Sequence, residues 1–246
     1  MLSLVFAWLG FAAFAASLGY FLFSYLVVFG PAPGTLAFWH IPSPFFSGPL
    51  APVVVNLALF TAFALHHSVF ARTRIKTIVT AHIPPDLERA AYTWVASALF
   101  VLVCWAWQPV PGVLYMLNSP WSWLGYSAQA IGVILTFLGS RALDVLDLAG
   151  VRHVLRARGD GAGPVRVELQ TTGVYGLVRH PLYFGWVLLV FGAPDMTATR
   201  FTFAVVSTIY LAVAIPFEER GLDDTFGPDY ARYRTQVRWR MLPGIY

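Results

Sequence analysis

Long stretches without a single charged residue are the feature of this chain that most constrains its fold. The four stretches that lack Asp, Glu, Lys and Arg are those before Arg72, from Arg89 to Arg141, from Arg179 to Asp195 and from Arg200 to Glu218. A helix needs roughly 20 apolar residues to cross about 30 Å of hydrocarbon, because each residue rises about 1.5 Å. Only 11% of the residues are charged, whereas soluble domains have about a quarter. The pattern therefore predicts an all-α, integral membrane protein.

The uncharged stretches have room for a polytopic bundle of five or six transmembrane helices. We expect these helices near Leu2 to Phe29, Leu50 to Phe70, Ala90 to Trp107, Trp121 to Ser140, Pro181 to Ala193 and Phe201 to Phe217. The fifth is short, so we expect it as the tilted partner of the sixth in a hairpin. The first lacks a basic leader and is longer than the apolar region of a secretory signal, so it is expected to be a membrane helix.

The same pattern predicts a single membrane-embedded domain over residues 1–246. Its expected parts are four transmembrane helices within 1–140, a cytoplasmic loop at 141–180, a helical hairpin at 181–217 and a cytoplasmic amphipathic tail at 218–246. Within the loop, the Gly and Pro cluster between Arg152 and Gln170 predicts a flexible connector. In the tail, Gly227 and Pro228 are expected to interrupt an amphipathic helix and to start a second short one.

Basic residues are distributed by loop, and this distribution predicts the orientation. With six crossings, all but one of the 16 Lys and Arg residues fall on one side of the membrane, and only Arg200 lies opposite. By the positive-inside rule that side is cytoplasmic and carries both termini. We therefore expect a bacterial inner membrane protein. The net charge of +4 is not gathered into one stripe, so nucleic acid is not an expected partner.

Side chains that often bind metals or form disulfides have no such pattern here. Cys104 is the only cysteine, so it cannot form an intramolecular disulfide and is expected to serve packing alone. No His or Cys cluster has the spacing of metal ligands. Asp144 and Asp147 are expected to face solvent in the loop rather than to coordinate a metal.

The segment that carries chemistry is GVYGLVRHPLYFG, from Gly173 to Gly185. Pro181 suits the first position of a helix, and a helix that begins there leaves backbone N–H groups directed at the membrane boundary. Such a helix start attracts an anion, and Arg179 and His180 add hydrogen-bond donors beside it. The sequence therefore predicts an anion-binding corner at the start of the fifth helix.

Two adjacent carboxylates, Glu218 and Glu219, stand where the sixth helix leaves the membrane. Both are expected at the depth of the predicted anion site, and a carboxylate beside an anion site suits a zwitterion. Adjacent helical residues point about 100° apart, so one glutamate is expected to face the ligand. We favour Glu219, and we expect the other to pair with Arg220 or Arg179.

These motifs resemble those of a known family. RHPLY at Arg179 to Tyr183, FEER at Phe217 to Arg220 and GPDYARY at Gly227 to Tyr233 resemble the isoprenylcysteine carboxyl methyltransferase and phospholipid methyltransferase superfamily of integral membrane proteins. Upstream, LHHSVFAR from Leu65 and PPDLERAAY from Pro84 are similar to the methanethiol S-methyltransferase and NnrU-like branch.

The resemblance implies S-adenosyl-L-methionine as the cofactor and methyl donor. It implies that the cofactor-binding residues are Tyr175, Val178, Arg179, His180, Pro181, Tyr183, Glu218 and Glu219. The ring of Tyr183 is a candidate contact for the sulfonium, although interfacial aromatic anchors are common. The implied acceptor is a small thiol such as methanethiol, or a related lipophilic molecule reached from the bilayer.

A thiol acceptor must ionise, because the thiolate is the nucleophile. His66 and Arg72 are the candidate catalytic residues, since they lie at the end of the second helix on the side of the donor site. The alternative for His66 is a position at the polar interface without a chemical role, and for His67 we favour that alternative.

Other functions remain open at this point. The acceptor could instead be a prenylated cysteine carboxylate or a phospholipid amine. An NADPH-dependent membrane reductase is an alternative enzyme class, because membrane sterol reductases resemble this superfamily near their C-terminus. A non-enzymatic NnrU-like membrane protein is a third interpretation. Binding of S-adenosylhomocysteine indicates a methyltransferase, whereas binding of NADPH indicates a reductase.

Overall fold

The fold is helical, as the uncharged stretches predict. The computed structural model describes residues 1–30, 50–69, 80–141, 143–160 and 168–246. The long helices are α1 (Leu2–Phe23), which continues into a π-helical turn (Ser24–Val28), α2 (Ala51–Val69), α4 (Glu88–Ala106), α5 (Ser122–Ser140), α8 (Pro181–Phe191), α9 (Ala198–Phe226) and α10 (Pro228–Gln236). The short elements are β1 (Val113–Met116), α6 (Val145–Leu148), α7 (Val151–Ala157), a 3-10 turn (Gly173–Gly176) and β2 (Asp195–Thr197), and β1 pairs with β2.

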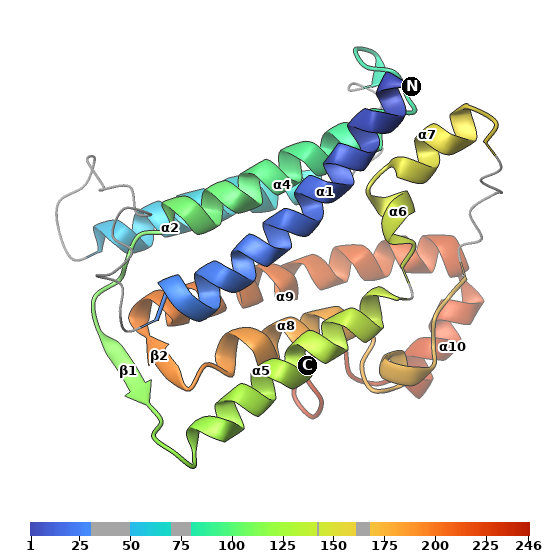
Figure 1. Ribbon diagram of the computed structural model, residues 1–246. Coiled ribbons are helices and arrows are strands. Elements are labelled where there is room, and N and C mark those ends of the chain that lie inside the picture. The colour runs from blue at the N-terminus through green and yellow to red at the C-terminus, as the bar shows by residue number, and fades with distance from the viewer. Residues whose placement is uncertain (31–49, 70–79, 142, 161–167) are drawn as a thin grey trace. The chain divides into compact units, whose positions relative to one another are not determined.

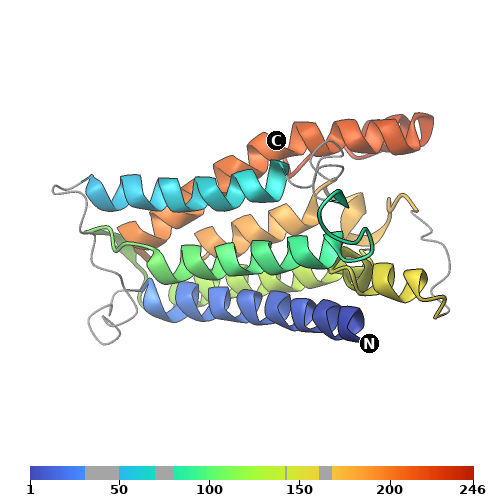
Figure 2. The same ribbon diagram turned by 90° about the horizontal axis from the view of Figure 1, so that it is seen from above.

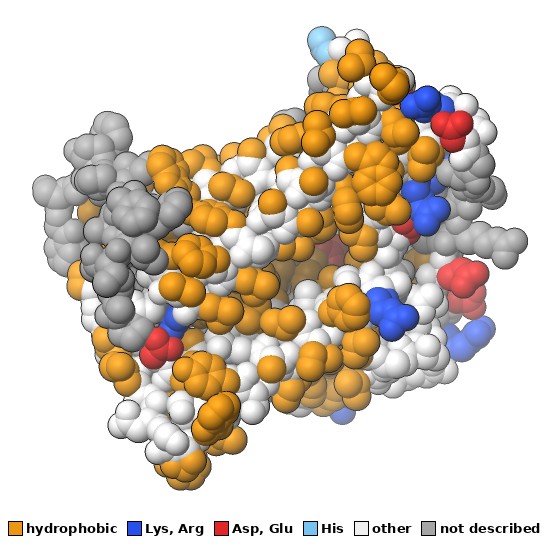
Figure 3. Space-filling view, viewed as in Figure 1, with side chains coloured by type: hydrophobic (Ala, Val, Ile, Leu, Met, Phe, Trp, Pro, Cys, Tyr) orange, Lys and Arg blue, Asp and Glu red, His pale blue; other side chains and the backbone are white. Residues whose placement is uncertain are grey.

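Within the described residues, five helices are long and apolar enough to cross a membrane: α1 with its extension, α2, α4, α5 and α9. In the most apolar windows of these helices only 17% to 39% of the residues are buried inside the protein. Hydrophobic side chains accordingly cover the helix faces that Figure 3 shows, over α1 and α5 among others. Apolar faces of this extent require lipid as their solvent, so the predicted multi-pass membrane protein is confirmed.

The chain divides into two compact units. The first contains Met1–Gly112, Asp144–Pro164 and Thr197–Thr199, and the second contains Val113–Leu143, Val165–Met196 and Arg200–Tyr246. In the first unit α4 packs against both α1 and α2 (Figures 1 and 2). A small core joins α1, α4 and α7 through Ala7, Ala90, Val151 and Val154.

The connector between α5 and α8 differs from the predicted loop, because it contains α6 and α7. Asp147, expected in solvent, is buried. Its carboxylate lies 2.5 Å from the Arg156 guanidinium and 3.4 Å from that of Arg89. Asp144 begins α6 by accepting a hydrogen bond from the Asp147 amide, as an N-cap aspartate does. The acidic pair therefore has structural partners in the first unit that sequence spacing did not reveal.

In the second unit α8 is too short to span a bilayer on its own and runs beside α5 (Figure 1). The two backbones touch where both helices have glycine. A Cβ atom added at Gly132 would lie 2.5 Å from the Gly185 carbonyl oxygen, and one added at Gly185 would lie 2.6 Å from the Gly132 carbonyl oxygen. Small residues let membrane helices approach this closely. The start of α8 is therefore held at the end of α5, beside Gly139.

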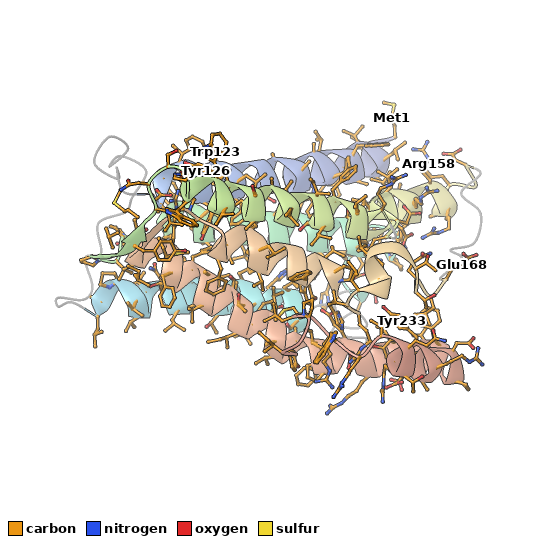
Figure 4. All side chains as sticks on the ribbon, turned by 90° about the horizontal axis from the view of Figure 1, so that it is seen from below. Met1, Trp123, Tyr126, Arg158, Glu168 and Tyr233 are labelled. Atoms are coloured by element: carbon orange, nitrogen blue, oxygen red, sulfur yellow. The ribbon has the colours of Figure 1, made fainter. Side chains whose placement is uncertain are left out.

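Helix α9 continues through Phe226 without a break at the predicted boundary after Phe217. Gly227 then adopts a positive φ of 49°, and α10 begins at Pro228, as predicted. The other end of this unit carries exposed aromatic side chains. Trp123 and Tyr126 lie there, away from Tyr233 of α10 (Figure 4). The ring centroids of Trp123 and Tyr126 are 6.1 Å apart. Aromatic side chains of this kind are typical of a membrane interface.

Candidate active site

The start of α8 and the end of the apolar part of α9 meet in the second unit. A third segment lies beside them, since the amides of Arg179 and His180 donate to the carbonyl oxygens of Trp239 and Arg240 at 2.9 and 2.8 Å. His180 is the N-cap of α8, and its carbonyl accepts the amides of Tyr183 and Phe184. Part of the predicted anion-binding N–H set is thus satisfied within the protein.

Arg179 is held by the protein through its Nε and one terminal nitrogen, in spite of its motif position. Its Nε donates to the Glu219 carboxylate at 2.7 Å, and one terminal nitrogen donates to the carbonyl oxygens of Val237 and Arg238 at 2.7 and 2.9 Å. Only 7% of the side chain is exposed. Arg179 therefore ties together α8, α9 and the segment after α10.

The two glutamates have different surroundings. The buried Glu219 divides its oxygens between Arg179 and Arg240, with Arg240 Nε at 3.1 Å. Glu218 is 44% exposed at its side chain. Its carboxylate accepts a short hydrogen bond from the Tyr183 hydroxyl and lies 3.5 Å from His180 Nδ1. Glu218, rather than the favoured Glu219, is the carboxylate with an open side.

His180 and Tyr183 form a stacked pair beside Glu218. Their ring centroids are 5.4 Å apart and the ring planes differ by 9°. His180 Nε2 lies 3.6 Å from Glu219, so the imidazole stands between the two glutamates. Together with Glu218, the pair brings an aromatic face, an imidazole and a partly exposed carboxylate to one corner of the second unit.

Two further predicted site residues, Tyr175 and Val178, contact the protein interior next to this corner. Val178 is completely buried. The Tyr175 hydroxyl donates to the Gly139 carbonyl at 3.1 Å, and the Tyr175 carbonyl accepts from the Tyr233 hydroxyl at 2.7 Å. Burial raises the pKa of Tyr233 and of its neighbour Tyr230. Both phenols therefore stay neutral near Arg179.

The predicted catalytic residue His66 lies near the end of α2 in the first unit. Its ring stacks on Tyr92 with centroids 5.1 Å apart. The neighbouring His67 is held by the Tyr92 hydroxyl, which lies 3.0 Å from both the His67 carbonyl oxygen and Nδ1. His67 therefore has a structural role in this unit. Arg72, the other predicted catalytic residue, lies outside the described residues.

Sequence reasoning missed the segment from Val237 to Tyr246, which supplies most of the partners of Arg179 and one partner of Glu219, Arg240. The segment does contain two cations, Arg238 and Arg240, but their partners cannot be read from spacing. Among the residues that the structure describes, no group of three or more His, Cys, Asp or Glu could hold a metal ion.

Comparison with known proteins places the chain in a family. It is 36% identical over 187 residues to methanethiol S-methyltransferase 1 of Bradyrhizobium diazoefficiens, and the aligned residues are 75% of this chain and 65% of that protein. It is 35% identical over 225 residues to the methanethiol S-methyltransferase of Mycobacterium tuberculosis, and this alignment spans 87% of this chain and 89% of that protein. Nurim of Xenopus laevis is 26% identical over 196 residues, or 76% of this chain. No family model and no solved structure matches.

The apolar helices and these relatives together define a multi-pass membrane protein of the methyltransferase class. More narrowly, the chain belongs to the methanethiol S-methyltransferase family. The resemblance indicated by RHPLY and FEER is thereby confirmed.

Proposed function

We propose that this protein binds S-adenosyl-L-methionine beside His180, Tyr183 and Glu218 and transfers its methyl group to a small thiol such as methanethiol. The observation that carries the proposal is the partly exposed Glu218 carboxylate next to the stacked rings of His180 and Tyr183. A carboxylate and an aromatic face suit the ammonium and sulfonium cations of this cofactor. The residues therefore fit the group that the family resemblance implies.

The remaining motif residues support the donor site from the protein side. Glu219 accepts hydrogen bonds from both Arg179 and Arg240, and Pro181 is the first residue of α8, next to His180. When bound, S-adenosylmethionine supplies a methyl group on a sulfonium that leaves as a neutral thioether. The protein then has to orient donor and acceptor and exclude water, which provides much of the rate in such a displacement. Rigid support from Arg179 and Glu219 serves that orientation.

For the acceptor, His66 is proposed as the base that takes the thiol proton, with Arg72 as a cation that stabilises the thiolate. Histidine exchanges protons near neutral pH, and the thiolate is the reactive form. Support for a thiol comes from the relatives named methanethiol S-methyltransferase. A lipophilic carboxylate would not need this base, because it is already ionised near neutral pH.

We also propose that the protein lies in a bacterial inner membrane with its termini and active site in the cytoplasm. The support is the charge distribution, in which Arg200 alone opposes the other basic residues. Cys104 is buried and is the single cysteine, so introduced cysteines can be labelled cleanly. Asp160→Cys should be shielded from an impermeant maleimide in intact cells, and Leu117→Cys should react. The reverse pattern would contradict the orientation.

The function is tested by calorimetric titration of the detergent-purified protein with S-adenosylhomocysteine and, separately, with NADPH, followed by a methanethiol assay read as dimethyl sulfide. Binding of S-adenosylhomocysteine with product formation is the expected result. Binding without product would retain the donor and replace the thiol with another acceptor. Binding of NADPH alone would contradict the proposal.

A further inference from the structure

Tyr246 has no role in the proposed methyl transfer, but it contacts Arg240, which supports the donor site through Glu219. Its hydroxyl accepts a hydrogen bond from an Arg240 terminal nitrogen at 3.1 Å. The Arg240 guanidinium carbon also lies 5.3 Å from the centre of the Tyr246 ring. Arg240 in turn donates through Nε to Glu219. Tyr246 thus binds a terminal nitrogen of the Arg240 guanidinium, while the Nε of the same group binds Glu219.

The position of the Tyr246 hydroxyl follows from a defect in α9. Pro216 lies inside this helix. Proline has no N–H, so the carbonyl four residues earlier loses its helical hydrogen bond. That carbonyl belongs to Ala212, and the Tyr246 hydroxyl donates to it over 3.4 Å. The segment of residues 237–246 therefore docks where α9 has a free backbone acceptor, six residues before Glu218.

The backbone of residues 237–246 keeps the Tyr246 ring in this place. The amides of Met241 and Leu242 both donate to the backbone oxygen of Tyr246, at 2.9 and 3.0 Å. The same tail presents the Trp239 and Arg240 carbonyl oxygens to the amides of Arg179 and His180. A contact at Tyr246 is thereby connected to the start of α8 through both the backbone and the Arg240 side chain.

We propose that Tyr246 is a positioning residue for the donor site: its hydroxyl fills the gap left by Pro216 in α9 and so holds Arg240 against Glu219, which fixes Arg179. The inference rests on the proposed function for its consequence in cofactor binding. Its structural part, the docking of the tail onto residues 179 and 180, is independent of any ligand.

The test compares Tyr246→Phe with a matched control. Tyr246→Phe removes the hydroxyl and keeps the ring over Arg240. Tyr115→Phe removes a hydroxyl that also donates to a helix carbonyl, that of Phe191, over the same 3.4 Å, and that lies outside the site. Tyr246→Phe should weaken S-adenosylhomocysteine binding about fivefold, the order expected for one lost hydrogen bond. Tyr115→Phe should bind like the wild type.

A double-mutant cycle separates positioning from general destabilisation. Arg240→Gln should itself weaken binding, and adding Tyr246→Phe to Arg240→Gln should cause no further loss, because the hydroxyl acts through Arg240. Multiplying losses would overturn the proposal, as would unchanged affinity in Tyr246→Phe.

Hydrogen exchange measured without ligand keeps this result separate from the proposed function. Tyr246→Phe should speed exchange of the Arg179 and His180 amides, whereas Tyr115→Phe should not. Unchanged exchange would overturn the docking, whether or not S-adenosylhomocysteine binds. Faster exchange in a protein that binds no S-adenosylhomocysteine would support the docking and contradict the proposed function instead.

Discussion

Glu219 and Arg179 form an ion pair 2.7 Å long in which the two side chains are only 6% and 7% exposed. The residues come from α9 and from the turn before α8, and the pair joins these elements in the second unit. Removing one partner of a buried pair leaves the other charge without compensation, which is costly. The pair therefore serves the architecture of the site more directly than it serves a ligand.

Different effects are expected from the two adjacent glutamates. Glu219→Gln should destabilise the protein by about 3 kcal/mol, because Arg179 remains buried and charged. Glu218→Gln should leave the thermal unfolding midpoint nearly unchanged, since its side chain is 44% exposed, and should weaken S-adenosylhomocysteine binding. Thermal unfolding and calorimetry on both variants check this. Equal destabilisation by the two substitutions would argue against separate roles.

A kinetic effect without a binding effect is expected at His66. His66→Ala should lower the rate of methanethiol methylation about 100-fold, the range of a lost general base, with unchanged affinity for S-adenosylhomocysteine. The deficit should shrink as pH rises, because more of the thiol then ionises in solution. A pH–rate profile measures this. A constant deficit at all pH values would assign His66 a structural role.

Close packing of α5 on α8 should make Gly185 intolerant of a side chain. Gly185→Ala places a Cβ 2.6 Å from the Gly132 carbonyl oxygen, so the helices must separate, at a cost of about 1–3 kcal/mol. Gly19→Ala in α1 is the control, because no atom lies within 4 Å of the added Cβ. It should be neutral or stabilise by up to about 1 kcal/mol. The unfolding midpoints of the two variants should move apart.

Asp147 should contribute strongly to the stability of the first unit. Asp147→Asn breaks contacts to Arg89 and Arg156 at a carboxylate that is 12% exposed, and about 3 kcal/mol should be lost. Asp160→Asn removes a partner of Arg158 that is 52% exposed and should change stability by less than about 1 kcal/mol. Similar midpoints for both variants would show that the buried cluster is not a stabilising element.

Much of the fold could be predicted from the order of residues alone. The boundaries of α1 together with its π-helical turn, and those of α2, α4 and α5, lie within a few residues of the prediction, because a run of uncharged residues long enough to span the hydrocarbon is most stable in lipid. The helix start at Pro181 and the break at Gly227 were predicted as well. These are local properties: proline and glycine restrict or free the backbone wherever they occur.

The partners of the charged residues could not be predicted in the same way. Spacing brought Arg179, His180, Glu218 and Glu219 to one boundary, but it left open which glutamate faces outward. That choice depends on the rotation of α9 and on the tail that brings Arg240 and Tyr246 beside it. The buried contacts of Asp147 likewise depend on where α4 and α7 meet. Transfer into lipid is a property of each segment, so the sequence by itself determined the membrane helices. Only the tertiary structure decided the ion pairs, because an ion pair depends on two side chains from distant segments reaching the same point.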